Sequence, residues 1–240
     1  MLEMSKITKV YRTELVETHA LRSLDLHVKE GEFVAITGPS GSGKTTLLNI
    51  VGLLETFTSG TFRLDGDDIS GLSDNARSKL RNRKIGFVFQ SFNLIPDLNL
   101  FDNVDVPLRY RGMAASERKK RIEEALERVG LASRMRHYPA ELSGGQQQRA
   151  AIARALAGSP RLLLADEPTG NLDSQMARSV LELIEDINNQ GTTIVMVTHD
   201  PELAARARRN VHIVDGVATD ISVDSKRAQP EAGKQPGQEA

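Results

Sequence analysis

The glycine-rich segment GPSGSGKT at residues 38–45 constrains the fold of this chain more than any other part of its sequence. It matches the P-loop pattern, follows the apolar run FVAIT at residues 33–37 and opens the helix-forming run TTLLNIVGLL. Such a loop turns backbone amides toward a phosphate, and the helix N-terminus adds a favourable potential. Lys44 is then placed to reach the terminal phosphates, and Thr45 to offer a hydroxyl to Mg²⁺. A glycine-rich turn that matches by chance is the minor alternative, given the flanking strand and helix.

Four short apolar runs share one pattern, which predicts buried strands of an α/β fold. The runs are FVAIT at 33–37, KIGFVF at 84–89, RLLLA at 161–165 and TIVMVT at 193–198. They are followed by Gly38, by Gln90, by Asp166 and Glu167, and by His199 and Asp200. Because ligands of open α/β sheets bind at the carboxyl ends of the strands, we expect these residues to meet in one crevice.

Between the second and third of these runs the pattern becomes helical, which predicts a helical insert in the α/β core. In SERKKRIEEALERVG, Ser116 is the expected N-cap and Gly130 the end of the helix. Three apolar residues share one face of that helix: Ile122, Leu126 and Val129. The run QQQRAAIARALAGSP then predicts a helix from about residue 146 that Gly158 and Pro160 end.

Composition limits the class of partner and of chemistry. Of the 240 residues 39% are hydrophobic, enough for one large α/β domain or for a core that carries a subdomain. With 31 Lys and Arg against 32 Asp and Glu the formal net charge is −1, so no global field attracts nucleic acid or anionic lipid. The lack of cysteine excludes thiol chemistry, and the five histidines are too scattered for a metal motif.

The two ends of the sequence carry expectations about location and order. MLEMSKITKV has no apolar signal core, and no stretch has the roughly 20 apolar residues that span a bilayer. We therefore expect a cytoplasmic protein that reaches the membrane only through a partner. From residue 222 the sequence is polar and rich in Pro, Gly and Gln, which predicts a disordered tail over 222–240.

The polar residues that follow the strands are the candidate catalytic groups. We assign Asp166 to the magnesium shell and Glu167, which is expected to project to another face, to the general base that polarises the attacking water. The alternative is a pair of acids that cap the turn at Pro168. Gln90 is a candidate for holding magnesium or the attacking water, and His199 for bonding a γ-phosphate. For Gln90 the alternative is an ordinary strand-end polar residue, and for His199 it is a satisfied surface or core histidine.

Two further features fit a nucleotide. Tyr11 lies before the first core strand and is a candidate for stacking on adenine; the alternative is a half-buried aromatic in an edge strand. Ser143, Gly144 and Gly145 precede a helix, where backbone amides and a serine hydroxyl again form an anion site. The same three residues also suit an ordinary helix cap.

Taken in order, GPSGSGKTT, Gln90, LSGGQ, LLLADEP, Asn171-Leu172-Asp173 and His199 resemble the nucleotide-binding subunit of ABC transporters. The resemblance covers residues 1 to about 220. It implies a P-loop NTPase (RecA-like) α/β core with an inserted α-helical subdomain and an N-terminal antiparallel β-subdomain. It places the ATPase domain at residues 1–221, with the core at 1–90 and 160–221 and the helical subdomain at about 91–159.

In that family two such domains form a head-to-tail dimer with two ATP molecules between them. The resemblance therefore implies ATP hydrolysis, ATP and Mg²⁺ as cofactors, and a second copy of this chain as partner. The implied ATP contacts are Tyr11, then Gly38, Pro39, Ser40, Gly41, Ser42, Gly43, Lys44, Thr45 and Thr46, and, across the dimer, Ser143, Gly144, Gly145, Gln146 and Asp173. The implied magnesium ligands are Thr45, Gln90 and Asp166, and the implied catalytic residues are Glu167, His199 and Gln90.

Three stretches narrow the resemblance: ADEPTGNLDS, the insert RTELVETHAL after Tyr11, and FQSFNLIPDLNLFDNV. They resemble the group that contains macrolide-exporter, lipoprotein-releasing and cell-division ATPases. An integral membrane permease is then the expected partner, on the cytoplasmic face of the inner membrane. Residues 91–106 are the expected place of docking, and buried packing of that apolar stretch is the alternative. Ala150 departs from the pattern, because many relatives have a larger aliphatic residue there.

Other functions use the same motifs. An ATP-driven switch that controls an extracytoplasmic hydrolase through a membrane partner has the same ATPase, so the sequence does not separate it from transport. A soluble ABC ATPase that acts on ribosomes or DNA usually has two such domains or a long coiled-coil insertion, and neither appears in this sequence. It would also be expected to carry a basic surface, for which this sequence offers only the small cluster RARR at 206–209. A P-loop kinase leaves LSGGQ and Glu167 unexplained. The cargo is not encoded in any motif of this chain.

Overall fold

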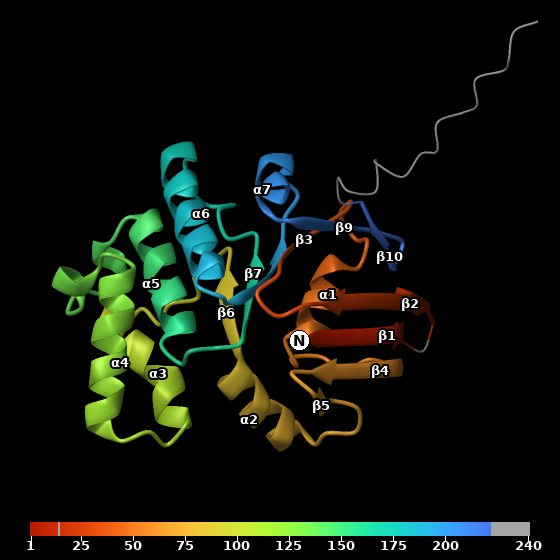
Figure 1. Ribbon diagram of the computed structural model, residues 1–240, viewed down its shortest axis with the longest axis horizontal. Coiled ribbons are helices and arrows are strands. Elements are labelled where there is room, and N and C mark those ends of the chain that lie inside the picture. The colour runs from red at the N-terminus through yellow and green to blue at the C-terminus, as the bar shows by residue number, and fades with distance from the viewer. Residues whose placement is uncertain (14, 222–240) are drawn as a thin grey trace, which may run out of the picture.

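A six-stranded sheet in the order β10-β9-β3-β8-β7-β6 forms the centre of the molecule (Figure 1). The computed structural model describes residues 1–13 and 15–221, so the tail expected over 222–240 lies outside the described residues. Neighbouring strands are parallel except for β10, which pairs antiparallel with β9. The strands are β3 (Phe33–Thr37), β6 (Ile85–Phe89), β7 (Leu162–Asp166), β8 (Thr193–Val197), β9 (Arg209–Val214) and β10 (Val217–Asp220).

The four apolar runs form β3, β6, β7 and β8, each within one residue of its expected bounds. Successive residues point to opposite faces of the sheet, so Leu163 joins one core cluster and Leu164 the other. Both faces are covered, which explains why these strands are apolar throughout. One face packs on α1 (Lys44–Val51), and the other on α5 (Gly144–Leu156) and α6 (Ser174–Asn189); α7 (Pro201–Arg206) follows β8.

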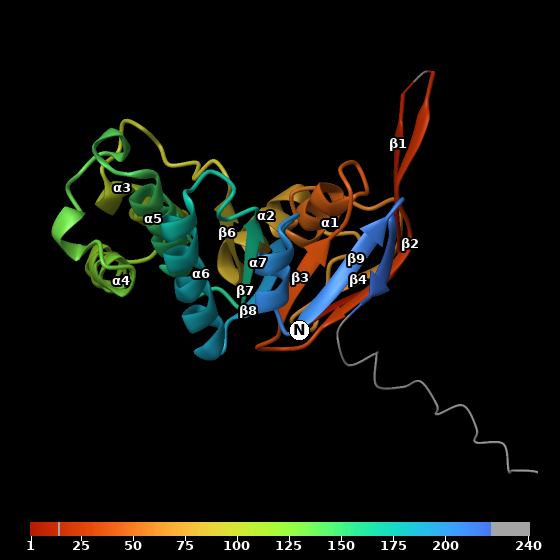
Figure 2. The ribbon, with the colours of Figure 1, turned by 90° about the horizontal axis from the view of Figure 1, so that it is seen from above.

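A second, antiparallel sheet in the order β2-β1-β4-β5 packs beside α1 (Figure 1). Its strands are β1 (Leu2–Arg12), β2 (Glu17–Val28), β4 (Ser59–Leu64) and β5 (Asp67–Asp68). Apolar residues of its inner face, such as Ile7, Leu24 and Phe62, join the core cluster that includes α1. The far end of the β1–β2 hairpin extends beyond the rest of the molecule (Figure 2). This sheet confirms the N-terminal antiparallel β-subdomain that the resemblance implies.

The helical insert follows β6 and lies together at one side of the six-stranded sheet (Figure 1). It consists of α3 (Leu100–Tyr110), α4 (Ala115–Arg128), short 3₁₀ turns at Ala132–Arg134 and Pro139–Glu141, and α5; α2 (Asp74–Lys84) precedes β6. Ile122, Leu126 and Val129 are all buried, which confirms the predicted apolar face of α4. None of the helices within residues 1–13 and 15–221 is long and apolar enough to cross a membrane.

Two helix starts differ from the expectation. Ser116 does not cap α4: the N-cap is Ala114, whose side chain has no oxygen to offer. The connection from α3 is only residues 111–114 long and turns at Gly112, whose φ is +70°, so the helix begins as soon as the chain has reversed. α5 begins two residues earlier than residue 146, because Ser143 caps it.

Candidate functional site

The P-loop joins the carboxyl end of β3 to α1, and two of its glycines are required by the backbone. Gly38 and Gly43 have φ of +143° and +106°. A Cβ atom at Gly38 would lie 2.1 Å from the carbonyl oxygen of Ile213, and one at Gly43 2.5 Å from that of Ala20. Gly43 is the N-cap of α1, and no side chain caps this helix. The first amides of α1 are therefore left for a ligand, as in other anion sites at helix N-termini.

Lys44, the first residue of α1, is folded back on the P-loop. Its Nζ donates to the carbonyl oxygens of Gly38 and Pro39 at 2.8 and 2.7 Å. The Oγ atom of Ser42 is buried and has no hydrogen-bond partner among the described residues, and Thr45 is exposed. The loop thus brings an ammonium group and hydroxyls to a helix N-terminus, which together suit a phosphate.

Glu167 and His199 come from the ends of neighbouring strands and touch each other. The Oε1 atom of Glu167 lies 2.7 Å from Nδ1 of His199 and accepts from the His199 backbone amide at 2.9 Å. Its Oε2 atom accepts from the hydroxyl of Thr198 at 3.3 Å. Glu167 lies outside β7 with φ of +45°, so a turn of the backbone, and not the predicted alternation of a strand, directs its carboxylate. The three contacts fix the carboxylate at the edge of the sheet.

Asp166 is the last residue of β7 and is partly buried. Burial raises the pKa of its carboxyl group, the neighbouring charge of Glu167 raises it further, and the ammonium group of Lys44 lowers it. The carboxylate of Asp166 is therefore poorly neutralised by the protein itself. A cation bound beside it would relieve that cost.

Gln90 follows β6, next to the end of β7, because Phe89 pairs with Asp166. Its Nε2 atom donates to Oδ1 of Asn171 at 3.2 Å, and Nδ2 of Asn171 returns a bond to the Gln90 carbonyl at 3.1 Å. The structure thus ties Gln90 to the loop that follows Glu167.

The second glycine segment forms a helix cap, as its alternative interpretation proposed. The Oγ atom of Ser143 accepts from the Gln146 amide at 3.4 Å, and Oε1 of Gln146 accepts from the Ser143 amide at 3.1 Å. Asp173 is likewise the N-cap of α6, where its carboxylate accepts from the amides of Gln175 and Met176 at 3.0 and 2.9 Å. Ser143 and Asp173 are both accessible enough to contact another molecule.

The two glycine segments belong to helices on opposite faces of the sheet. Leu47 and Ile50 of α1 join the core cluster on one face, and Ile152 and Ala153 of α5 the cluster on the other. Figure 2 shows α1 and α5 separated by the strands. Each glycine segment therefore lies at the start of a helix on a different face of the sheet.

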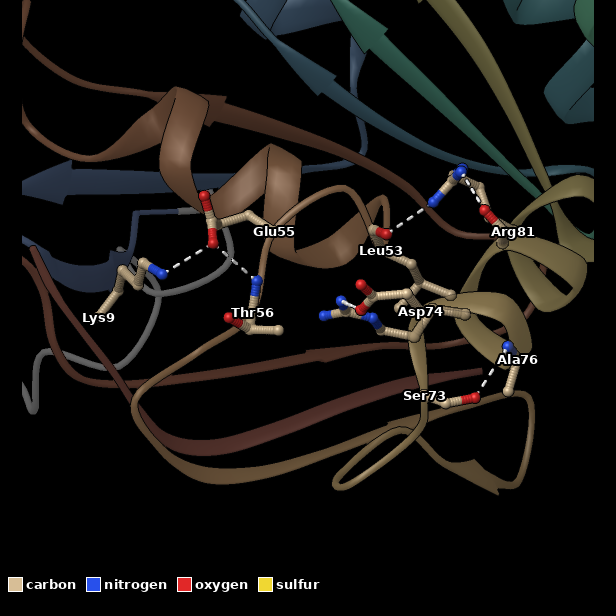
Figure 3. A network of polar contacts seen from close by, with 10 residues as sticks. Lys9, Leu53, Glu55, Thr56, Ser73, Asp74, Ala76 and Arg81 are labelled. Carbon is tan, nitrogen blue, oxygen red and sulfur yellow. Dashed lines mark hydrogen bonds and ion pairs between the residues drawn. The ribbon is translucent and has the colours of Figure 1, made fainter.

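Tyr11 lies near the free end of the β1–β2 hairpin and is 40% exposed. One face of its ring is occupied by Lys9, whose Nζ lies 4.8 Å from the ring centroid. Lys9 is buried and forms an ion pair of 2.8 Å with Glu55, which also accepts from the Thr56 amide, as Figure 3 shows. The hydrogen bond from Lys9 lowers the pKa of the Glu55 carboxyl group. β1 lies between β2 and β4 in the sheet, but its pairing with β4 ends at Thr8, so around Tyr11 it pairs with β2 alone.

The same close-up shows how the segment after α1 is fastened on its other side. Arg81 donates to the carbonyl oxygen of Leu53 at 2.8 Å, and Ser73 caps α2 through the amide of Ala76 (Figure 3). The turn that ends α1 is thus held both by the β1 strand and by α2.

Sequence reasoning missed Lys9, Glu55 and Gln148. Gln148 is fully buried in α5, and a signal for it existed, since it precedes the buried residues Ile152 and Leu156 at helical spacing. No pattern pointed to Lys9 and Glu55, because their pairing joins residues that are 46 positions apart.

A strand, P-loop and helix, with an Asp-Glu pair at the end of β7, a parallel strand of the same sheet, define a P-loop nucleotide-binding α/β protein. The family model described as ABC transporter matches residues 21–170, which is more than half of the chain. The chain therefore belongs to the ABC transporter family, and it is an ABC ATPase with the cassette fold that the sequence predicts.

Relatives and solved structures agree with this assignment. The chain is 50% identical over 216 residues to the uncharacterized ABC transporter ATP-binding protein YknY of Bacillus subtilis, covering 90% of this chain and 94% of that one. It is 50% identical over 220 residues to the macrolide export ATP-binding/permease protein MacB of Syntrophobacter fumaroxidans, covering 90% of this chain but 31% of that protein. A dimeric structure of the ATP-binding cassette MJ0796, in a post-hydrolysis state bound to ADP and Pi, has a TM-score of 0.84 and 43% identity, covering 93% and 99% of the two chains.

Proposed function

We propose that two copies of this chain close head to tail on two ATP molecules and that hydrolysis drives an integral membrane permease. The observation that carries the proposal is the placement of two glycine segments at the starts of helices on opposite faces of one sheet. A two-fold axis then lets the P-loop of each copy face the Ser143 segment of the other, which gives two identical sites. The dimeric MJ0796 cassette supports this arrangement.

Within each site we assign the ATP contacts as follows. The P-loop amides and Lys44 hold the phosphates, with Lys44 exchanging the Gly38 and Pro39 carbonyls for phosphate oxygens. The free face of the Tyr11 ring stacks on adenine. Across the dimer, the amides at the start of α5 and the hydroxyl of Ser143 bind the γ-phosphate, and Asp173 contacts the interface beside it.

In the hydrolytic step, Glu167 accepts a proton from the attacking water. The water oxygen bonds to the γ-phosphorus, the bond from that phosphorus to the bridging oxygen breaks, and ADP leaves with inorganic phosphate. The contacts from Thr198 and His199 hold the Glu167 carboxylate at the strand ends. His199, hydrogen-bonded to this carboxylate, is exposed enough to reach the γ-phosphate as well.

The donor set fits Mg²⁺. No cluster of three or more acidic, histidine or cysteine side chains occurs in the part of the chain that the structure describes, and Mg²⁺ typically uses one or two carboxylates together with phosphates and water. Asp166, whose carboxylate the protein leaves poorly neutralised, Thr45 and Gln90 would hold the ion. When bound, Mg²⁺ neutralises charge on the phosphates.

The membrane subunit has a candidate docking place in a cleft of about 690 Å³ beside β6. Leu54, Phe89 and Tyr110 are among the residues that line it, and Tyr110 is 84% exposed. Of the stretch at residues 91–106, Leu94 and Phe101 pack against the core, as the alternative interpretation had it, and Ile95 is exposed. We infer that the permease binds this cleft and holds the chain at the cytoplasmic face of the membrane.

The test uses Glu167→Gln, which keeps the shape of the side chain and removes the base. We expect this variant to bind ATP and form a stable dimer on size-exclusion chromatography, with turnover reduced by about 10²-fold or more. Lys44→Ala is the control and should not dimerise. Wild-type turnover in Glu167→Gln would remove Glu167 as the base, and a chain that stays monomeric with ATP would overturn the dimer.

Recovering the trapped Glu167→Gln protein from its native membranes tests the partner. An integral membrane protein should co-purify with it in the presence of ATP, identified by mass spectrometry. Substituting Tyr110 and Leu54 by Ser should release that protein and leave the ATP-dependent dimer intact. If the trapped dimer carries no membrane protein, the transport assignment is wrong although the ATPase assignment stands.

A further inference from the structure

Gln148 is a fully buried polar side chain that neither core packing nor the proposed reaction explains. It belongs to α5, the helix that Ser143 caps. Its Nε2 atom donates to two backbone carbonyls, that of Phe89 at 3.3 Å and that of Pro168. Its Oε1 atom has no hydrogen-bond partner within residues 1–13 and 15–221.

The two acceptors flank the candidate catalytic groups. Phe89 directly precedes Gln90, and Pro168 directly follows Glu167. A single amide of α5, the helix that begins at the Ser143 segment, therefore joins this helix to both strand-end loops of the chain's own proposed ATP site. The bonds between Gln90 and Asn171 connect these two loops a second time.

The orientation of the amide is determined by its surroundings. With the nitrogen and oxygen exchanged, Oε1 would face two carbonyl oxygens, so the donor side must point to Phe89 and Pro168. The consequence is a buried oxygen without a donor, which is costly. An apolar side chain of equal volume would avoid that cost. We therefore infer that a glutamine occupies this position because of the two hydrogen bonds that it donates.

Arg154, further along α5, fastens the same loop. Its guanidinium donates to the carbonyl of Phe92 at 2.9 Å and to that of Asn93. Phe92 and Asn93 both have positive φ, at 59° and 51°, so the segment after Gln90 is held in a specific conformation against α5. Arg154 thus joins α5 to this loop at a second point.

We propose that Gln148 is a positioning residue that couples the two ATP sites of the dimer. When the Ser143 end of α5 engages the ATP of the partner, Gln148 moves the backbone on either side of the catalytic groups and so sets Gln90 and Glu167 for hydrolysis in its own site. The inference rests on the proposed dimer and names the residue that transmits occupancy from one half-site to the other.

Gln148→Met tests the coupling, because it keeps the volume and removes both donated bonds. Asn188→Leu is the matched control: Asn188 is a buried amide of α6 that also donates to two backbone carbonyls, those of Gly31 and Thr192, at the opposite edge of the sheet. The ATPase rate of each full-length variant is measured against ATP concentration, which gives its Hill coefficient, KM and kcat. The melting temperature of each variant is measured alongside, so that a loss of stability can be told from a loss of coupling.

We expect Gln148→Met to lower kcat about tenfold and to bring the Hill coefficient to about 1, as for the loss of coupling between linked sites. In a Ser143→Arg background, where no partner engages, its affinity for a fluorescent ATP analogue should change less than about twofold. Asn188→Leu should lower the melting temperature and keep the cooperativity. An unchanged Hill coefficient and kcat in Gln148→Met, or an equal loss of ATP binding in the monomer, overturns the inference.

A mixed dimer gives a test that leaves Gln148 in place. One copy carries Lys44→Ala and binds no ATP, and the other carries Ser143→Arg with Glu167→Gln and holds ATP against the intact Ser143 segment of the first. Hydrogen exchange in the Lys44→Ala copy should then change at residues 90–93 and 169–171 as well as at 143–147. Changes confined to 143–147 refute the coupling, whereas the absence of any mixed dimer refutes the proposed dimer instead.

Discussion

Asp166 illustrates at the scale of one residue how a site can oppose stability. Burial and the charge of Glu167 raise its pKa, so the folded protein disfavours the ionised carboxyl group. A group whose pKa is raised on folding adds stability while it is protonated, and this contribution is lost as the pH rises through the folded pKa. At neutral pH, without magnesium or nucleotide, the Asp166 charge therefore destabilises the fold.

We expect Asp166→Asn to raise the melting temperature at neutral pH, because it removes that charge while keeping the size of the side chain. The gain should shrink as the pH falls and the wild-type carboxyl group becomes protonated. Calorimetry over a pH series measures both effects, with the exposed Asp97→Asn as control. A lower melting temperature of Asp166→Asn at neutral pH would contradict the assigned cause, and ATP hydrolysis should be lost in either case.

Asp173 has two roles at the scale of an element that substitution can separate. Asp173→Ala removes the N-cap of α6 and should lower the free energy of unfolding by about 1 kcal/mol, whereas Asp173→Asn keeps a capping oxygen and should stay within about 0.3 kcal/mol of wild type. Urea unfolding measures the difference. The ATPase rate of Asp173→Asn then reports on the interface alone, and equal stability losses in the two variants would show that the cap is not what Asp173 supplies.

Arg111 joins three helices where α3 ends. It donates to the Asn82 side chain at 2.7 Å and to the carbonyl of Gly158 at 2.5 Å. A Cβ atom at Gly158 would lie 2.2 Å from its Nη2 atom, so Gly158→Ala should displace the guanidinium and lower the free energy of unfolding by about 2 kcal/mol. In an Arg111→Ala background the same change should cost much less, as a double-mutant cycle in urea measures. Additive costs would mean that the two residues do not interact.

The elements also show what a sequence can specify. The strands β3, β6, β7 and β8 were predictable because apolar runs bounded by polar residues carry a local signal. The start of α4 was not, because the length of the preceding turn, rather than the capping preference of Ser116, determines it. The contact between Glu167 and His199 and the bonds of Gln148 join segments distant in sequence, so they depend on strand order and helix packing that no local pattern encodes.

At the scale of the whole molecule, the proposed dimer predicts complementation between two inactive variants. Lys44→Ala lacks a working P-loop and Ser143→Arg lacks a working partner-facing segment. Neither variant should dimerise alone, so the dimers in an equal mixture are mixed, and each has one of its two sites intact; at most about half of wild-type activity should return. The copy that hydrolyses carries Ser143→Arg, so its own α5 is not engaged, and the coupling through Gln148 should lower this recovery by up to about tenfold. ATPase assays over a range of mixing ratios measure this. No recovery, with mixed dimers shown to form, would indicate that each chain completes its own site.

The ammonium group of Lys44 donates to the carbonyls of Gly38 and Pro39, two acceptors that belong to the P-loop itself. Nucleotide entry is then an exchange of acceptors and not the filling of a void. A ligand that reaches the ammonium group must replace these two carbonyls as acceptors, and anionic phosphate oxygens suit this because hydrogen bonds between charged groups are the stronger ones. A neutral nucleoside has no such acceptor, so we expect Lys44 to favour nucleotides over nucleosides.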